Sequence, residues 1–109
     1  MTKGKIILVA FPFTDLSGHK VRPALVLSSL ERGTDFIACF ISSKPDSKIN
    51  KTDIKVEPTK ENGLKFTSII KPSKIATLEK KIALGEIGAL DQKTIKILDS
   101  KLKIILGLN

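Results

Sequence analysis

The chain is poor in the residues from which enzymes build conventional active sites. Its 109 residues include one cysteine and one histidine, and no tryptophan or tyrosine. A single cysteine excludes an internal disulfide and suits a reducing compartment. With one cysteine and one histidine, the sequence contains no zinc-binding motif and disfavours a Cys-His or Ser-His-Asp triad. Cys39 lies in the apolar run Phe36–Ile41, which predicts a buried side chain and not a nucleophile.

Other motifs of catalysis and membrane association are missing as well. No GxxxxGK[ST] or GxGxxG phosphate-binding loop is present, and the eleven acids are scattered singly, unlike those of a two-metal nuclease. The first apolar run, Ile6–Phe11, is too short to span a membrane and has no signal-cleavage ending. We therefore expect no bound metal, no cofactor and no membrane association, and a cytoplasmic protein.

What the chain does have is an ordinary globular composition and a large positive charge. It is 41% hydrophobic and 28% charged, and its length predicts one domain over residues 1–109. Nineteen Lys and Arg against eleven Asp and Glu give a net charge of +8. Such a balance favours a polyanionic partner, nucleic acid above all, although it also describes a lysine-rich soluble surface.

The pattern along the chain predicts short strands followed by one helix. Residues 12–21 and 42–52 have loop composition, Pro58–Gly63 predicts a turn, and Pro72 is expected to interrupt a strand. Residues 83–90 are ambiguous between strand and turn because Gly85 and Gly88 weaken either element. The expected strands are Ile6–Phe11, one from about Arg22 to Ser28, Asp35–Ile41, Asp53–Glu57 (half-exposed), Lys65–Ile70 and Ser73–Leu78.

The predicted helix closes the sequence. Asp91 is a good N-cap, Gly107 a good C-terminal stop, and the apolar residues between them recur at helical spacing. Several short strands and one terminal amphipathic helix predict a small, strongly bent antiparallel sheet or barrel.

RNA cleavage is a reaction that this limited set of residues can perform. The RNA 2′-hydroxyl is a built-in nucleophile, so a protein needs neither a metal nor a nucleophile of its own. It needs a base near the 2′-hydroxyl, an acid near the leaving 5′-oxygen and cationic donors on the phosphate. Histidine, arginine, lysine and hydroxyl side chains suffice for these roles.

Two segments near the N-terminus are more specific indicators of function than the composition is. Residues 4–18, GKIILVAFPFTDLSG, and 22–28, RPALVLS, resemble the N-terminal signature of the MazF/PemK toxins, roughly G-D-I-V-x-V-x-F-P-F-T-D-x-S-G followed by R-P-A-L-V-L-S. Ile41-Ser42-Ser43, the segment Thr67–Leu78 and the terminal helix agree in order. Lys5 departs from the pattern, where an acid is common, and we expect this to alter surface charge only.

The resemblance implies a mainly β fold with short helices, the CcdB/MazF-like, SH3-like barrel with a C-terminal helix. It implies a toxin of a type II toxin–antitoxin system that cleaves single-stranded RNA without metal. The implied partners are RNA, a second copy of the chain in a homodimer, and an antitoxin with an acidic flexible tail. DNA binding is expected only together with the antitoxin.

The resemblance also assigns candidate site residues. Arg22 matches the catalytic arginine of the family's Arg-Pro pair, and its guanidinium can grip a phosphate with two donors; otherwise it is a solvated strand-end arginine. Ser42 matches the catalytic Thr or Ser after the third strand, with Ser43 next to it as the alternative hydroxyl.

A second group comes from the Kid/PemK branch of the family. His19 follows Gly18 as a histidine does there, and it can transfer protons near neutral pH, although a single loop histidine is commonly just exposed. Lys71 and Ser73 stand where that branch has an Arg and an Asp. Ser73 cannot act as a carboxylate base, so that branch's mechanism does not carry over unchanged.

The remaining candidates are expected to bind and not to react. Phe13 and Thr14 fall in the first loop, where the family contacts RNA; Phe13 either stacks on a base or packs back onto the barrel. The run Lys44–Lys60 interleaves lysines with acids, Asp53 among them, and we interpret it as a mostly solvated face. Two other functions fit the fold. One is inhibition of a DNA topoisomerase, as in the CcdB relatives, which engage gyrase through a C-terminal tryptophan; this chain has no tryptophan, which argues against it. The other is a non-catalytic nucleic-acid-binding barrel.

Overall fold

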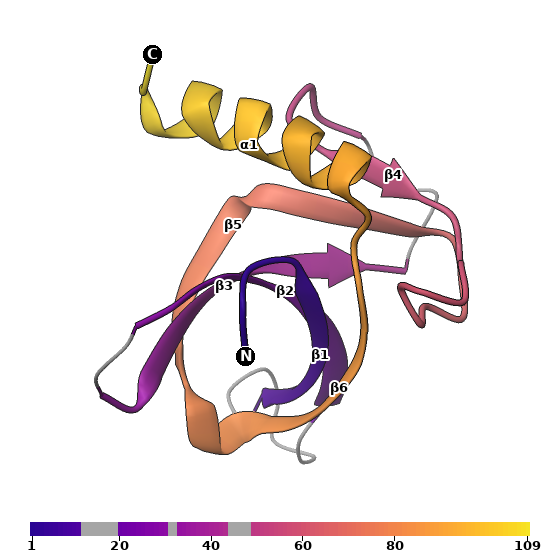
Figure 1. The fold of residues 1–109 in the computed structure, drawn as a ribbon, viewed down its shortest axis with the longest axis vertical. Coiled ribbons are helices and arrows are strands. Elements are labelled where there is room, and N and C mark those ends of the chain that lie inside the picture. The colour runs from indigo at the N-terminus through magenta and orange to yellow at the C-terminus, as the bar shows by residue number, and fades with distance from the viewer. Residues whose placement is uncertain (12–19, 31–32, 44–48) are drawn as a thin grey trace.

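The residues that the structure describes form six antiparallel strands and a C-terminal helix (Figure 1). The structure, a computed structural model, describes residues 1–11, 20–30, 33–43 and 49–109. The strands are β1 (Lys5–Phe11), β2 (Lys20–Ser29), β3 (Asp35–Ser42), β4 (Ile54–Val56), β5 (Ser68–Glu79) and β6 (Ala83–Ala89); a 3-10 turn, η1 (Lys80–Ile82), precedes β6, and α1 spans Gln92–Leu106.

The strand order requires the sheet to curl. The strands lie in the order β4-β5-β3-β2-β1-β6, so three strands separate β5 from β6 across the sheet. Only the three residues of η1 join β5 to β6 along the chain. The sheet must therefore bend back on itself, as the ring of ribbons in Figure 1 shows. This confirms the predicted strongly bent, barrel-like sheet, although the ladder among the described residues remains open between β4 and β6.

Alternate residues of the strands pack into two separate hydrophobic clusters. Because successive side chains of a strand point to opposite faces, neighbours such as Ala24 and Leu25 belong to different clusters. The helix cluster packs sheet residues against Leu98 of α1. It consists of Ile6, Leu25, Cys39, Ile41, Ile54, Val56, Leu64, Ile70, Leu90 and Leu98. The opposite cluster consists of Ile7, Val9, Ala24, Val26, Phe36, Ala38 and Leu78.

The gap between β4 and β6 is bridged by the turn at Pro58–Gly63. The Ala89 backbone N–H donates to the Glu61 carbonyl oxygen at 2.8 Å. A side chain on Gly88 would place its Cβ 2.3 Å from the Asn62 carbonyl, and one on Gly63 would place it 2.0 Å from the Ile87 oxygen. Two glycines therefore allow backbone to touch backbone where the ladder stops.

Asn62 holds the turn in shape. Its buried side chain accepts from the backbone N–H groups of Thr59 (2.9 Å) and Leu64 (3.0 Å) through Oδ1. Its Nδ2 donates to the Glu57 carbonyl oxygen at 2.9 Å, and the Thr59 hydroxyl accepts from its backbone N–H at 3.0 Å. A buried amide with its hydrogen bonds made fixes one conformation of the turn.

The predicted helix is confirmed together with both of its ends. The Asp91 carboxylate accepts from the Thr94 backbone N–H at 2.7 Å, and hydrogen bonding to Thr94 lowers the pKa of Asp91. Gly107 ends the helix in the left-handed conformation, with φ of 70°. No helix within the described part of the chain is long and apolar enough to cross a membrane.

The structure corrects three details of the strand prediction. Strand β2 begins at Lys20, earlier than expected, and residues 65–67 lie outside β5. Pro72 does not interrupt the strand: β5 continues through it, and the pairing with β3 shifts register between Cys39 and Phe40. A proline has no N–H to donate to a ladder, so an irregular position is where a strand tolerates it. In the ambiguous segment 83–90, residues Ala83–Ala89 form strand β6.

The contact that bridges β4 and β6 can be tested with matched glycine variants. Gly88→Ala should lower the free energy of unfolding by about 1–3 kcal/mol, because the new methyl overlaps the Asn62 carbonyl. Gly85→Ala is the control, since a Cβ at that position of the same strand meets nothing within 4 Å. The measurement is the urea midpoint of each variant. A Gly88→Ala midpoint equal to that of Gly85→Ala would show that the close approach is not a constraint.

Candidate functional site

Arg22 and Ser42 occupy neighbouring positions on one face of the sheet. Arg22 pairs with Val9 of β1 near the start of β2, and Ser42 ends β3. The β2–β3 pairing ends at Ala24 and Phe40, and Arg22 and Ser42 each lie two residues beyond that pair. Because alternate residues of a strand share a face, Arg22 and Ser42 lie on the same face of the sheet. Arg22 is exposed and Ser42 is partly buried.

Lys71 belongs to the next row of the same face. It pairs with Phe40 across β3 and β5, and Ser42 pairs with Ile69. Lys71 therefore lies one strand beyond Ser42 and two residues along, on the side of the sheet that faces away from the helix cluster. With strands about 4.8 Å apart and two residues spanning about 7 Å, such positions are near neighbours for long side chains.

Lys71 is bound to a carboxylate that the sequence interpretation placed elsewhere. Its Nζ lies 3.3 Å from Oδ2 of Asp53, whose side chain is fully buried. The same oxygen accepts from the Asn50 backbone N–H at 3.0 Å. Asp53 is thus not part of a solvated face, which corrects the expectation for the run Lys44–Lys60 at this residue. No local pattern signalled it, because the pairing depends on how β4 aligns with β5.

The other predicted residues separate into three groups. Ser43 is exposed and lines an apolar groove of about 310 Å³ with Val21, Pro23 and Phe66 on its walls. Ser73 is exposed and lies between Lys71 and Ile75, where the β3–β5 register shifts. The remaining candidates, His19, Phe13 and Thr14, lie outside the described residues. The structure thus brings Arg22, Ser42 and Lys71 onto one face.

Lys55 is a further cation on this face that sequence reasoning did not single out. It pairs with Ile69 across β4 and β5, in the row that contains Ser42. Its neighbours Ile54 and Val56 point into the helix cluster, so Lys55 points away from it and is exposed. The sequence signal for Lys55 was a basic residue in a predicted strand that alternates polar and apolar residues.

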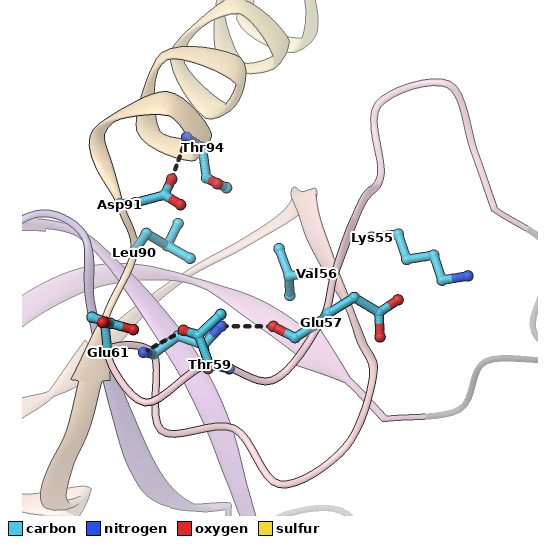
Figure 2. A pocket seen from close by; sticks show the side chains of 9 residues that line it. Lys55, Val56, Glu57, Thr59, Glu61, Leu90, Asp91 and Thr94 are labelled. Carbon is cyan, nitrogen blue, oxygen red and sulfur yellow. Dashed lines mark hydrogen bonds between the residues drawn. The ribbon is translucent and has the colours of Figure 1, made fainter.

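A second cavity differs in chemistry from this face. It has a volume of about 560 Å³ and lies between β4, the turn at Pro58–Gly63 and the start of α1 (Figure 2). Its lining contains three carboxylates, Glu57, Glu61 and Asp91, against one ammonium, that of Lys55. No predicted site residue lines it, and its charge disfavours a phosphate group. Among the residues described, no three His, Cys, Asp or Glu side chains come together as a metal-binding group.

Cys39 is fully buried in the helix cluster, as predicted. Burial raises the pKa of the Cys39 thiol to about 12, because desolvation penalises the thiolate. The thiolate is the reactive form of cysteine. Cys39 is therefore a packing residue and not a nucleophile.

The curled sheet and the terminal helix define a small, barrel-like, mainly β fold. The model of the PemK-like, MazF-like toxins of type II toxin–antitoxin systems matches residues 2–106, and the chain belongs to this family. Among proteins with curated functions, none matches the sequence.

Solved structures agree with this assignment at the level of the fold. The chain is similar to MazF in a MazE–MazF complex from Deinococcus radiodurans, with a TM-score of 0.81 and 18% identity over 100% of this chain and 97% of the other. It is similar to an endoribonuclease in complex with its cognate antitoxin from a mycobacterial species, with a TM-score of 0.77 and 20% identity over 100% and 97%. The Mycobacterium tuberculosis toxin MazF-mt6 gives a TM-score of 0.74 and 20% identity over 96% and 98%.

The burial of Cys39 predicts its chemical behaviour. In the folded protein the thiol should resist alkylation by iodoacetamide at about pH 8.5, the pKa of an unperturbed cysteine, where an exposed cysteine is half ionised. Its own ionisation requires a pH near 12. Mass spectrometry should detect modification only after denaturation. Alkylation of the native protein at the rate of the denatured chain would contradict the buried assignment.

Proposed function

We propose that the protein is a metal-independent endoribonuclease, the toxin of a type II toxin–antitoxin pair, that cleaves single-stranded RNA at preferred sequences and thereby inhibits translation and growth. The observation that carries this proposal is the shared face of Arg22, Ser42 and Lys71 in a member of the PemK-like, MazF-like family. Solved relatives of the same fold are named as endoribonucleases, which supports the reaction class.

The proposed reaction is a transesterification within the RNA. The 2′-oxygen loses its proton and attacks the adjacent phosphorus, and the bond from phosphorus to the 5′-oxygen breaks. The products are a 2′,3′-cyclic phosphate and a 5′-hydroxyl, which receives a proton. His19 is our candidate for moving these protons, because histidine titrates near neutral pH.

The described residues would stabilise the phosphate during this step. The planar guanidinium of Arg22 offers paired donors to two phosphate oxygens, where negative charge redistributes in the transition state. The Ser42 hydroxyl can donate to the same phosphate. Lys71 adds a second cation from the neighbouring row. Thr14, Ser43, Ser73 and a stacking Phe13 are proposed to bind the flanking nucleotides.

The proposed partners follow from charge and from the relatives. Two of the similar structures are complexes of a toxin with its antitoxin. A net charge of +8 suits both RNA and an antitoxin with an acidic flexible tail. We place the protein in the cytoplasm, with DNA binding only in the company of the antitoxin.

The activity is tested directly with a purified protein and a single-stranded RNA oligonucleotide. Cleavage should proceed in excess EDTA and leave the cyclic phosphate and 5′-hydroxyl ends. Arg22→Ala should lower the single-turnover rate at saturating RNA by about 100- to 1000-fold, the usual effect of removing a preorganised donor. Arg22→Lys should also be badly impaired, since it keeps the charge and loses the two-pronged geometry.

The control for this experiment is Lys60→Ala, which removes an exposed cation from the turn at Pro58–Gly63. It should cleave at nearly the wild-type rate. Activity that disappears in EDTA and returns with magnesium would refute the metal-independent mechanism. Binding without any cleavage would favour the non-catalytic barrel, and a wild-type rate for saturated Arg22→Ala would make Arg22 a binding residue only.

We also propose that the chain forms a homodimer. Ile97 and Ile104 lie seven residues apart on α1, on one side of the helix, and are 41% and 69% exposed. Exposed apolar side chains of this size on the outer side of a helix are typical of a surface that a second subunit covers.

Light scattering at micromolar concentration should therefore give twice the mass of the chain. Ile104→Glu should shift the protein toward the monomer, because a charge is costly in a covered apolar surface. Lys103→Glu changes the charge at the neighbouring exposed position and should leave the dimer intact. A wild-type protein that is strictly monomeric would exclude this assembly.

A further inference from the structure

The ion pair between Lys71 and Asp53 is largely buried, unlike the exposed ion pairs elsewhere on the described surface. The Asp53 side chain is 0% exposed, and that of Lys71 is 15% exposed. Oδ2 of Asp53 accepts from Lys71 and from the Asn50 backbone N–H. Oδ1 is buried and has no hydrogen-bond partner in the described structure. The carboxylate is thus removed from water with half of its acceptor capacity unused.

A buried ion pair of this kind contributes little to the free energy of folding. Removing a carboxylate from water costs several kcal/mol, and the attraction to its partner offsets this only when the remaining lone pairs are satisfied. Apolar residues of similar size commonly replace buried ion pairs without loss of stability. A function that needs a charge at this place is therefore the better explanation of Asp53.

We propose that Asp53 is a positioning residue of the RNA-cleaving site and acts through Lys71. This inference rests on the proposed function. Asp53 cannot touch RNA itself, because no part of its side chain reaches solvent. Lys71 is the only route from the carboxylate to the surface that the described contacts provide.

The geometry indicates how the Asp53 carboxylate acts on Lys71. A lysine ammonium sits on four rotatable methylenes and carries three donors. The contact at 3.3 Å engages one donor with Asp53 and leaves two for a phosphate. Lys71 lies on the same sheet face as Arg22 and Ser42. Asp53 therefore confines the ammonium to the side of the sheet where the scissile phosphate is proposed to lie.

The backbone supports the same arrangement. Continuing the β4–β5 register by one residue from Ile54 and Ile70 places Asp53 opposite Lys71. Asp53 and Asn50 also exchange hydrogen bonds, with the Asp53 N–H donating to the Asn50 carbonyl oxygen at 3.1 Å. The chain before β4 is thus folded around the carboxylate, which fixes its position before any RNA binds.

The test is a double-mutant cycle on single-turnover cleavage of a saturating RNA oligonucleotide. Asp53→Asn keeps the shape and removes the charge, and it should lower kcat by about 10- to 100-fold, the effect of a misplaced group near the reacting centre. KM should change little, since many other cations bind the RNA backbone. Asp99→Asn removes the carboxylate of an exposed ion pair with Lys3 and is the matched control; it should leave kcat unchanged.

The decisive comparison is made in a Lys71→Met background. There Asp53→Asn should have no further effect on kcat, because the residue through which it acts is gone. A double variant slower than Lys71→Met would overturn the proposal. This comparison does not require the single Asp53→Asn variant to fold. A wild-type kcat for a folded Asp53→Asn protein would overturn it equally.

A measurement without RNA separates this inference from the proposed activity. The rate at which an amine-acylating reagent labels Lys71, followed by mass spectrometry, should rise in Asp53→Asn, while that of exposed Lys55 stays constant. Unchanged labelling of Lys71 would mean that Asp53 does not hold the ammonium. If the labelling rises but the wild-type protein cleaves no RNA, the proposed function fails and the ion pair stands.

Discussion

The close backbone contact between the turn at Pro58–Gly63 and strand β6 is the constraint on which the rest of the fold depends. A sheet with β4 at one end and β6 at the other has two unpaired edges, which curl toward each other. Gly63 and Gly88 allow the chains to meet there without side chains, and Asn62 fixes the turn that makes the contact. The position of β4, and with it of Asp53, follows from this contact.

The register of four neighbouring strands then assembles the candidate site. β2, β3, β5 and β4 contribute Arg22, Ser42, Lys71 and Lys55 to one face. The helix cluster takes up buried neighbours of the last three, namely Ile41, Ile70, Ile54 and Val56. A shift by one residue in β3, β5 or β4 would turn the polar side chain toward that cluster. These buried neighbours therefore fix the face to which Ser42, Lys71 and Lys55 point.

The sequence predicted the features that arise from local patterns. The helix followed from Asp91, Gly107 and the apolar spacing between them, and most strands followed from apolar, β-branched runs bounded by turn residues. The strand through Pro72 did not, because only pairing with β3 reveals an irregular register that accepts a proline. Arg22, Ser42 and Lys71 were selected by resemblance, and their roles stay predictions. Asp53 was missed because its partner is eighteen residues away on another strand.

Two cations of the candidate face, Lys71 and Arg22, differ in how much of their charge is available. The charge of Lys71 is largely compensated by Asp53 at 3.3 Å, so its attraction for a distant phosphate is weak and its orientation is restricted. Arg22 is exposed, and among the described residues no ion pair compensates it. Long-range attraction of a phosphate is therefore stronger at Arg22 than at Lys71. Lys71 is suited to a short-range contact in which direction matters more than net charge.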